Sequence, residues 1–192
     1  MTTFAVFDQR PIVVAVAGPN GAGKTTFYHA HLASAGLRFV NADLLALELR
    51  LDAGGAMAMA NALRRALVQR RESFVFETVF SDPVADKLTF LTETASLGYT
   101  VVLCYIAIPS AATSEERVAM RVSQGGHDVP SEKLKTRFPR TLANLHAAIR
   151  DLPHVLVFDH SDLDRPYRLV ATFERGQCTE RVEPLPPWLE LP

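Results

Sequence analysis

The sequence is poor in cysteine, with only Cys104 and Cys178, which stand far apart and without the spacing of a metal site. This excludes a disulfide scaffold of the kind that stabilises small secreted domains. Cys104 lies within the apolar run TVVLCYIAI. We therefore expect its thiol to be buried and unreactive.

Long apolar runs and a dominant charge are also lacking. The longest apolar runs reach roughly ten residues, whereas about 20 are needed to span a bilayer. The start of the chain, MTTFAVFDQRP, has neither the basic residues nor the apolar stretch of a signal peptide. The formal net charge of −1 gives no basic field that would attract nucleic acid or a membrane surface. We expect a cytoplasmic protein without membrane contact, and nucleic acid is disfavoured as a partner.

Apolar runs of strand length alternate with longer segments of helical period, which is typical of α/β proteins with a parallel sheet. The 192 residues are 48% hydrophobic, enough for one sizeable core, and no repeat or long linker divides them. We predict one domain over residues 1–192, a three-layer α/β/α fold. Its five-stranded, mainly parallel sheet is followed by a C-terminal β-hairpin and tail at about 165–192. The strands are expected at Ile12–Ala17, Arg38–Asn41, Ser73–Phe76, Thr100–Ile108 and Val155–Asp159, and the hairpin at Tyr167–Glu174 and Gln177–Val182.

Helices are expected between these strands, and glycine and proline mark several of their ends. Gly54-Gly55 indicates a break before a helix over residues 55–70, and Pro139 is expected to break or kink the last helix. The arginines of the 55–70 helix and its end are expected on an exposed face; they are Arg64, Arg65, Arg70 and Arg71. The helices are expected from about Gly23, over 55–70, from Pro83 to Leu97, from Ser110 to Ser123, and from Pro130 to Arg150.

A glycine-rich loop separates the first strand from the first helix. Residues 18–25, GPNGAGKT, match the phosphate-binding pattern G-x-x-x-x-G-K-[ST] without a mismatch. Glycines allow successive N–H groups to point at one anion, Lys24 supplies charge to the β- and γ-phosphates, and the Thr25 hydroxyl can hold Mg²⁺. The preceding strand and following helix are the context that this motif requires, so we predict that residues 1–192 form a P-loop NTPase-like domain. The expected nucleotide-binding residues are Gly18, Pro19, Asn20, Gly21, Ala22, Gly23, Lys24, Thr25 and Thr26.

Several absences narrow the class of P-loop protein. The chain has no ABC-type LSGGQ signature and no GTPase-type N-K-x-D motif, and five strands are few for a motor or helicase. Acidic residues at the ends of the second and third strands, with arginines late in the chain, are the layout of P-loop kinases of small molecules. In this layout, ligands lie beyond the carboxyl ends of the strands.

Two acidic residues fall at such strand ends. Asp43 follows the second strand, where a carboxylate can accept the proton of an attacking hydroxyl; it could instead cap the helix that follows. Glu77 ends the third strand, which we expect beside the first. Together with Thr78 it would contact substrate or, through water, Mg²⁺; a solvated strand-end acid is the alternative. Asp159 ends a run that resembles a Walker B strand, but we predict a turn residue because a fifth strand should lie away from the metal.

The region 117–140 carries six Lys or Arg against two acidic residues. Arginines stabilise the charge that spreads over a phosphoryl group during transfer. Arg117 and Arg121 share one helix face and are predicted to be catalytic, whereas Arg137 and Arg140 are predicted to contact nucleotide phosphates. Plain solvation, or pairing with nearby acids, is the alternative for each of them.

The same region contains a loop in which a glycine pair precedes His127. Glycines permit the motion of a lid that closes over a site and excludes water. We therefore expect a lid here and a substrate contact from His127.

At this point the residues resemble a known family. Taken in order, the motifs are similar to those of the zeta toxins, and more closely to the small stand-alone bacterial members of that family. The resemblance covers roughly residues 11–159. The segments that carry it are AGPNGAGKTTF, FVNADLL, ESFVFETVFS, RVSQGGHDVP and RFPRTLANL.

The resemblance implies a kinase that phosphorylates the sugar of UDP-N-acetylglucosamine. It implies that Lys24 and Thr25 bind ATP and Mg²⁺, that Asp43 is the base for the sugar hydroxyl, and that Glu77 is a substrate-side acid. It also implies an antitoxin protein as partner. No base-reading element in the sequence favours ATP over GTP. A nucleotide-dependent switch or ATPase that acts on a protein partner is the alternative function.

We predict that the Lys24→Ala variant loses nucleotide binding or activity, because the ammonium group supplies the charge beside the phosphates. Titration calorimetry with nucleoside triphosphates measures this directly. A variant that binds as the wild type does would contradict the assignment of the loop.

Overall fold

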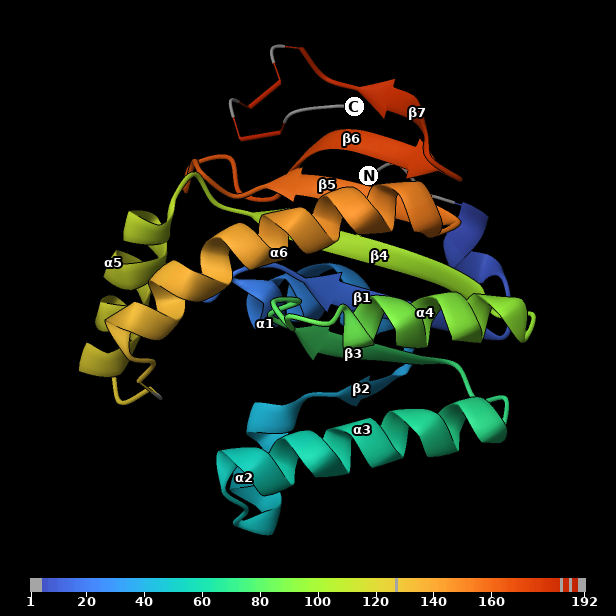
Figure 1. The fold of residues 1–192 in the computed structure, drawn as a ribbon, viewed down its shortest axis with the longest axis horizontal. Helices are drawn as coiled ribbons and strands as arrows, with labels where there is room; N and C mark the ends of the chain where they lie inside the picture. The colour runs from blue at the N-terminus through green and yellow to red at the C-terminus, as the bar shows by residue number, and fades with distance from the viewer. Residues whose placement is uncertain (1–4, 127, 184, 187, 190–192) are drawn as a thin grey trace.

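The computed structural model describes residues 5–126, 128–183, 185–186 and 188–189. Its strands form one sheet in the order β2-β3-β1-β4-β5-β6-β7 (Figure 1). Strands β1 to β5 pair in parallel, whereas β6 pairs antiparallel with β5 and β7 antiparallel with β6. The strands are β1 (Ile12–Ala17), β2 (Arg38–Val40), β3 (Phe74–Thr78), β4 (Thr100–Ala107), β5 (His154–Asp159), β6 (Arg168–Glu174) and β7 (Gln177–Arg181).

The prediction of a five-stranded sheet with a separate hairpin is therefore wrong in one respect. The hairpin forms where expected, but it joins the sheet, which has seven strands and is mixed. The physical reason is the edge of β5, whose backbone N–H and C=O groups would otherwise remain unpaired.

The two central strands are apolar on both faces. Every side chain of β1 is buried, and β4 is buried from its second residue onward. Such continuous apolar runs suit strands that helices cover from both sides. Cys104 lies in β4 with no exposed surface, and burial raises the pKa of its thiol. The prediction of a buried thiol is confirmed.

The helices cover both faces of the sheet, which confirms the predicted three layers. Helices α3, α4 and α6 pack on one face (Figure 1), and α1 with η2 packs on the other. None of the helices in the described ranges has both the length and the apolar character needed to cross a bilayer. The helices are α1 (Lys24–Phe27), α2 (Ala42–Leu49), α3 (Ala53–Gln69), α4 (Asp86–Ser96), α5 (Ala111–Ser123) and α6 (Ser131–Asp151), with shorter turns η1 (Ala5–Asp8), η2 (Tyr28–Leu32) and η3 (Ala33–Ala35).

Two helix starts differ from those expected. Gly54-Gly55 lies inside the first turn of α3 and not before it. The reason is that Asp52 is the N-cap, and its carboxylate accepts a hydrogen bond from the Gly55 N–H at 2.6 Å. Helix α4 begins at Asp86 instead of Pro83. The reason is Ala85, whose φ of 52° is left-handed and interrupts the helical path.

The predicted break at Pro139 does not occur, since α6 is continuous. The helix buries Leu134 before the proline and Leu145 after it, so tertiary packing holds the helix on both sides of the proline. Beside the proline, which has no N–H to donate, Arg140 Nε donates to the Thr136 carbonyl at 3.1 Å.

Helix α6 also holds the loop that follows β3. Thr141 Oγ1 donates to the Val79 carbonyl at 2.9 Å, and Asn144 Nδ2 donates to the Phe80 carbonyl at 2.9 Å. These bonds satisfy backbone acceptors that no strand or helix would pair. The loop after β3 is therefore placed by a helix more than 60 residues later in the chain.

Arg64 is buried, which corrects the prediction that it lies on an exposed face. Its side chain is 4% exposed, and its guanidinium lies 4.8 Å from the Phe76 ring centroid and 5.8 Å from that of Phe90. It also donates a hydrogen bond to Asn61. Burial lowers the pKa of Arg64 to about 10. Arg65, by contrast, is exposed as expected.

We predict that Arg64→Ala lowers the free energy of unfolding by about 2–3 kcal/mol, because it removes a cation–π contact and leaves the packed stem unfilled. The matched control is Arg65→Ala on the same helix, which should stay within about 0.5 kcal/mol of the wild type. Urea denaturation measures both. Equal losses would contradict a structural role for the buried guanidinium.

Candidate active site

Parallel strands bring their carboxyl ends to one edge of the sheet, and the candidate residues lie along this edge. Strand β3 pairs with β1, as predicted, so Glu77 lies opposite Val16, just before the glycine-rich loop begins. Strand β2 pairs with β3 on its other side and leads into α2. The edge thus gathers the loop, Glu77 and the start of α2, although they are far apart in the sequence.

The glycine-rich loop has the backbone conformation of a phosphate cradle. Gly18, Gly21 and Gly23 all have positive φ, at 143°, 75° and 78°. A Cβ on Gly18 would lie 2.1 Å from the Ile106 carbonyl oxygen, so only glycine fits there. Alternating conformations of this kind allow neighbouring N–H groups to converge on an anion. The loop residues fit a polyphosphate.

Lys24 is buried beside this loop. Its side chain is 6% exposed, and its Nζ donates to the Pro19 carbonyl at 3.0 Å and lies 3.9 Å from Glu77 Oε1. Burial lowers the pKa of Lys24, whereas the charges of Glu77 and Asp43 oppose that shift. The ammonium group therefore lies close to the two carboxylates of this edge, Glu77 and Asp43.

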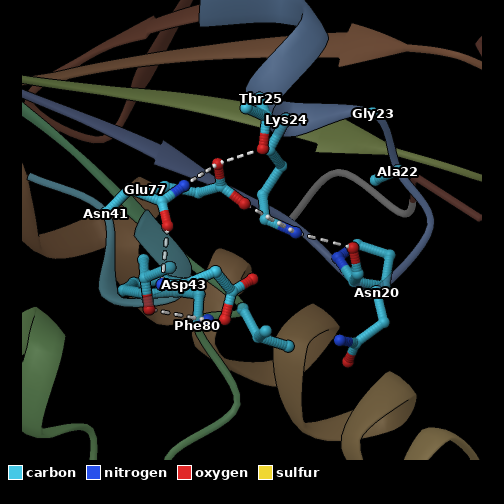
Figure 2. Close-up of polar contacts among 12 residues, drawn as sticks. Asn20, Ala22, Gly23, Lys24, Thr25, Asn41, Asp43, Glu77 and Phe80 are labelled. Atoms are coloured by element: carbon cyan, nitrogen blue, oxygen red, sulfur yellow. Dashed lines mark hydrogen bonds and ion pairs between the residues drawn. The ribbon is translucent and has the colours of Figure 1, made fainter. Parts of the chain in front are cut away.

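Glu77 connects the loop to the start of α2 (Figure 2). Thr25 Oγ1 donates to Glu77 Oε2 at 2.7 Å, and Asn41 Nδ2 donates to the same oxygen at 2.9 Å. With Lys24 beside the other oxygen, the carboxylate has partners on both sides. A carboxylate against the hydroxyl of a phosphate-binding loop is a donor set that suits Mg²⁺, with oxygen ligands only.

Asn41 has a second role that the sequence reasoning missed. Its Oδ1 accepts hydrogen bonds from the N–H groups of Asp43 and Leu44, at 2.8 and 3.2 Å, so it is the N-cap of α2. The alternative reading of Asp43 as the cap is therefore wrong. The Asp43 side chain is exposed in the first turn of α2 and near enough to Lys24 to affect its pKa. The signal for this arrangement was Asn41 itself, a favoured capping residue just before the helix.

The predicted arginines approach the site to different degrees. Burial lowers the pKa of Lys24, and the charges of Arg121 and Arg137 lower it further, so both charges act at the site. Arg117 packs over the loop, since a Cβ on Gly21 would lie 3.0 Å from its own Cβ. Arg140 contacts its own helix through Nε.

Three further predicted residues take different places. Thr78 Oγ1 accepts a hydrogen bond from the Phe80 N–H at 3.1 Å, a local turn contact. Thr26 is exposed in α1. His127 lies outside the described residues, so its predicted substrate contact stays a prediction.

Asp159 is the last residue of β5, so the predicted turn position is wrong by one residue, although its carboxylate bonds to the turn that follows the strand. Its Oδ1 accepts from the Ser161 N–H at 3.0 Å, and its Oδ2 lies 3.4 Å from Arg168. Strand β5 is separated from β1 by β4, so this carboxylate is one strand farther from the loop than Glu77 is.

Three side chains at the loop were not predicted at all. Ser114 Oγ donates to the Asn20 carbonyl at 2.7 Å, His160 Nδ1 lies 2.9 Å from the Ala22 carbonyl oxygen, and a third contact comes from Tyr167. No spacing or motif marks these residues, because they come from α5 and from the segment between β5 and β6.

The fold and the loop together define a P-loop NTPase-like α/β protein. The family model described as AAA domain matches residues 13–138, and the chain belongs to this family. No curated protein matches the sequence.

Several solved structures share this fold. One is a chain of the AvrRxo1-ORF1:AvrRxo1-ORF2 complex with sulphate ions, at 19% identity and a TM-score of 0.70, covering 88% of this chain and 60% of that one. The same complex with ATP matches at 18% identity and a TM-score of 0.69, with the same coverage. A structure of the PezAT toxin–antitoxin system of Streptococcus pneumoniae matches at 16% identity and a TM-score of 0.61, covering 85% of this chain and 72% of that one. The chain thus spans three-fifths of the AvrRxo1 chain that it resembles.

We predict that Gly18→Ala destabilises the fold by about 3 kcal/mol or more, because the added Cβ combines a backbone clash with a strained φ. The matched control is Gly36→Ala, where φ is 65° but nothing lies within 4 Å of the added Cβ. That variant should lose only about 1 kcal/mol. Urea denaturation compares them, and equal losses would show that the contact with Ile106 does not constrain the loop.

Proposed function

We propose that this protein is a kinase that uses ATP and Mg²⁺ to phosphorylate a hydroxyl group of a small polar metabolite. The observation that carries the proposal is the network around Glu77, which joins the phosphate loop to the start of α2. A nucleotide cradle and the exposed carboxylate of Asp43 thus lie at one edge of the sheet. The fold likeness to a complex with ATP is consistent with this proposal.

The loop residues would hold the nucleotide. Backbone N–H groups of residues 18–26 would bind the phosphates, with Lys24 as the neighbouring charge. The Thr25 hydroxyl would bind Mg²⁺, and Glu77 would hold it directly or through water. The metal, when bound, supplies positive charge at the phosphate oxygens. Arg117, Arg121, Arg137 and Arg140 are the proposed sources of further positive charge.

Asp43 is the proposed general base. The acceptor hydroxyl oxygen forms a bond to the γ-phosphorus, and the bond from that phosphorus to the bridging oxygen breaks, which releases ADP. The hydroxyl proton passes to the Asp43 carboxylate. Because Asn41 caps α2, Asp43 is not required for capping and its side chain is exposed to an incoming acceptor.

The acceptor class follows from the resemblance to zeta toxins. UDP-N-acetylglucosamine is the first candidate, with Glu77 and Thr78 on the substrate side. An antitoxin protein is the proposed partner, and the fold likeness to a chain of a toxin–antitoxin system agrees with it. The competing function is a nucleotide-dependent switch that changes a contact with a partner protein, without phosphorylating a small molecule.

Label transfer separates the two functions. The protein is incubated with γ-labelled ATP and Mg²⁺, with and without a panel of UDP-sugars, nucleosides and small sugars. Label that moves to an acceptor supports the kinase and identifies its substrate. Label that is released only as phosphate, or that stays on ATP, overturns the kinase and favours the switch.

We predict that Asp43→Ala binds ATP within about twofold of the wild type but transfers phosphate at least about 100-fold more slowly, because the general base is lost. Calorimetry measures binding, and label transfer measures the rate. The matched control is Glu48→Ala, an exposed acid on the same helix, which should retain both. Parallel loss of binding and transfer in the Asp43 variant would count against its role as base.

A further inference from the structure

Three side chains outside the glycine-rich loop each bond to one of its carbonyl groups. Ser114 Oγ donates to Asn20 at 2.7 Å. His160 Nδ1 lies 2.9 Å from the Ala22 carbonyl oxygen, and the Tyr167 hydroxyl donates to the Gly23 carbonyl at 3.0 Å. Ser114 belongs to α5, whereas the other two belong to the connection between β5 and β6. Three carbonyl groups of the loop thus accept hydrogen bonds from side chains that lie outside the loop.

Peptide geometry gives these bonds a consequence for the site. The peptide units of this loop are trans, so each C=O points opposite to the N–H of the next residue. Holding the Asn20 and Ala22 carbonyls therefore orients the N–H groups of Gly21 and Gly23 toward the other side. Holding the Gly23 carbonyl orients the N–H of Lys24 in the same way. These are N–H groups of the phosphate cradle itself.

We propose that Ser114 and His160, with a smaller contribution from Tyr167, are positioning residues that hold the phosphate cradle in its binding conformation. A glycine-rich backbone can adopt many conformations. Without such bonds, binding a phosphate would have to order the loop, and the entropic cost would weaken the affinity. This inference rests on the proposed function insofar as it takes the loop to bind a polyphosphate. It adds which residues prepare the loop for that ligand.

The His160 contact defines its protonation state. A carbonyl oxygen only accepts, so Nδ1 must carry the hydrogen. The imidazole is 8% exposed, and burial lowers its pKa, which favours the neutral ring with that hydrogen on Nδ1. Arg117 Nη2 donates to the His160 backbone carbonyl at 2.9 Å, and Arg117 Nη1 lies 3.5 Å from Nδ1. The Ala22 carbonyl oxygen is much nearer to Nδ1, at 2.9 Å, so this contact assigns the hydrogen. Since Nδ1 carries a hydrogen in both charge states, the contact does not depend on pH.

The three contacts should differ in how strongly they affect the affinity for phosphate. The Gly23 carbonyl also accepts the Phe27 N–H at 2.8 Å, the first bond of the helix that follows, so it stays held without Tyr167. No described backbone N–H outside the regular elements bonds to the carbonyls of Asn20 and Ala22. Ser114 and His160 should therefore matter more than Tyr167.

The test compares two variants at His160 that separate packing from hydrogen bonding. His160→Phe keeps a ring against Tyr167, whose centroid is 4.2 Å away, but has no donor. His160→Asn loses the ring but places an amide N–H where Nδ1 lies. The probe is inorganic tripolyphosphate, which contacts the cradle and has no base or sugar. Titration calorimetry gives its affinity, and thermal unfolding gives the stability of each variant.

We expect His160→Phe to bind tripolyphosphate about tenfold more weakly than the wild type, which corresponds to about 1.4 kcal/mol for a lost bond that orients the cradle. We expect His160→Asn to stay within about threefold, although its melting temperature should be the lower of the two. A residue that only supports the fold would rank affinity and stability in the same order. Tyr167→Phe should bind within about twofold, and Ser114→Ala should resemble His160→Phe.

Each outcome bears on the inference. Equal tripolyphosphate affinity in the wild type and His160→Phe overturns it, as does weaker binding by His160→Asn than by His160→Phe. A wild-type protein that binds no tripolyphosphate overturns both this inference and the proposed nucleotide site. Failure to transfer label to any acceptor, by contrast, would remove the kinase function and leave the binding result and this inference in place.

Discussion

The contacts of the Glu77 carboxylate are the constraint on which the candidate site depends. One of its oxygens accepts hydrogen bonds from Thr25 in the phosphate loop and from Asn41 at the start of α2, and the other faces the Lys24 ammonium. A largely buried charge requires partners of this kind, because an unpaired carboxylate would be costly to desolvate. Because Thr25 and Asn41 both donate hydrogen bonds to Glu77, the loop and α2 are fixed relative to each other. The distance between the glycine-rich loop and Asp43 is therefore set by the end of β3.

The phosphate loop itself is stabilised by parts of the chain that follow it by about 90 to 150 residues. Ser114, His160 and Tyr167 contact its outer side, and Arg117 is tied to His160. Strand β6 covers the edge of β5, and the connection that leads to it places an imidazole and a phenol behind the loop.

Residues with local signals were predictable. The strand–loop–helix pattern around Lys24 and the turn after Asp159 follow from apolar runs and glycine spacing, and the position of β3 beside β1 follows from the layout of P-loop kinases. The errors arose where tertiary packing overrides local preference. Pro139 lies within α6 because the helix is buried on both sides of it, and Arg64 is buried because two aromatic rings cover its guanidinium.

The amino-acid sequence alone determined the class of the protein, because the conformation of the phosphate loop depends on glycines at defined spacings and on the strand and helix that flank it. It also determined that acids follow the second and third strands. Only the tertiary structure decided which side chains meet there: that Asn41 caps α2 in place of Asp43, that Glu77 faces Thr25 and Lys24, and that His160 bonds to Ala22. The reason is physical. Backbone conformation is encoded by neighbouring residues, whereas hydrogen bonds between distant segments depend on strand order and helix packing, which no local pattern records.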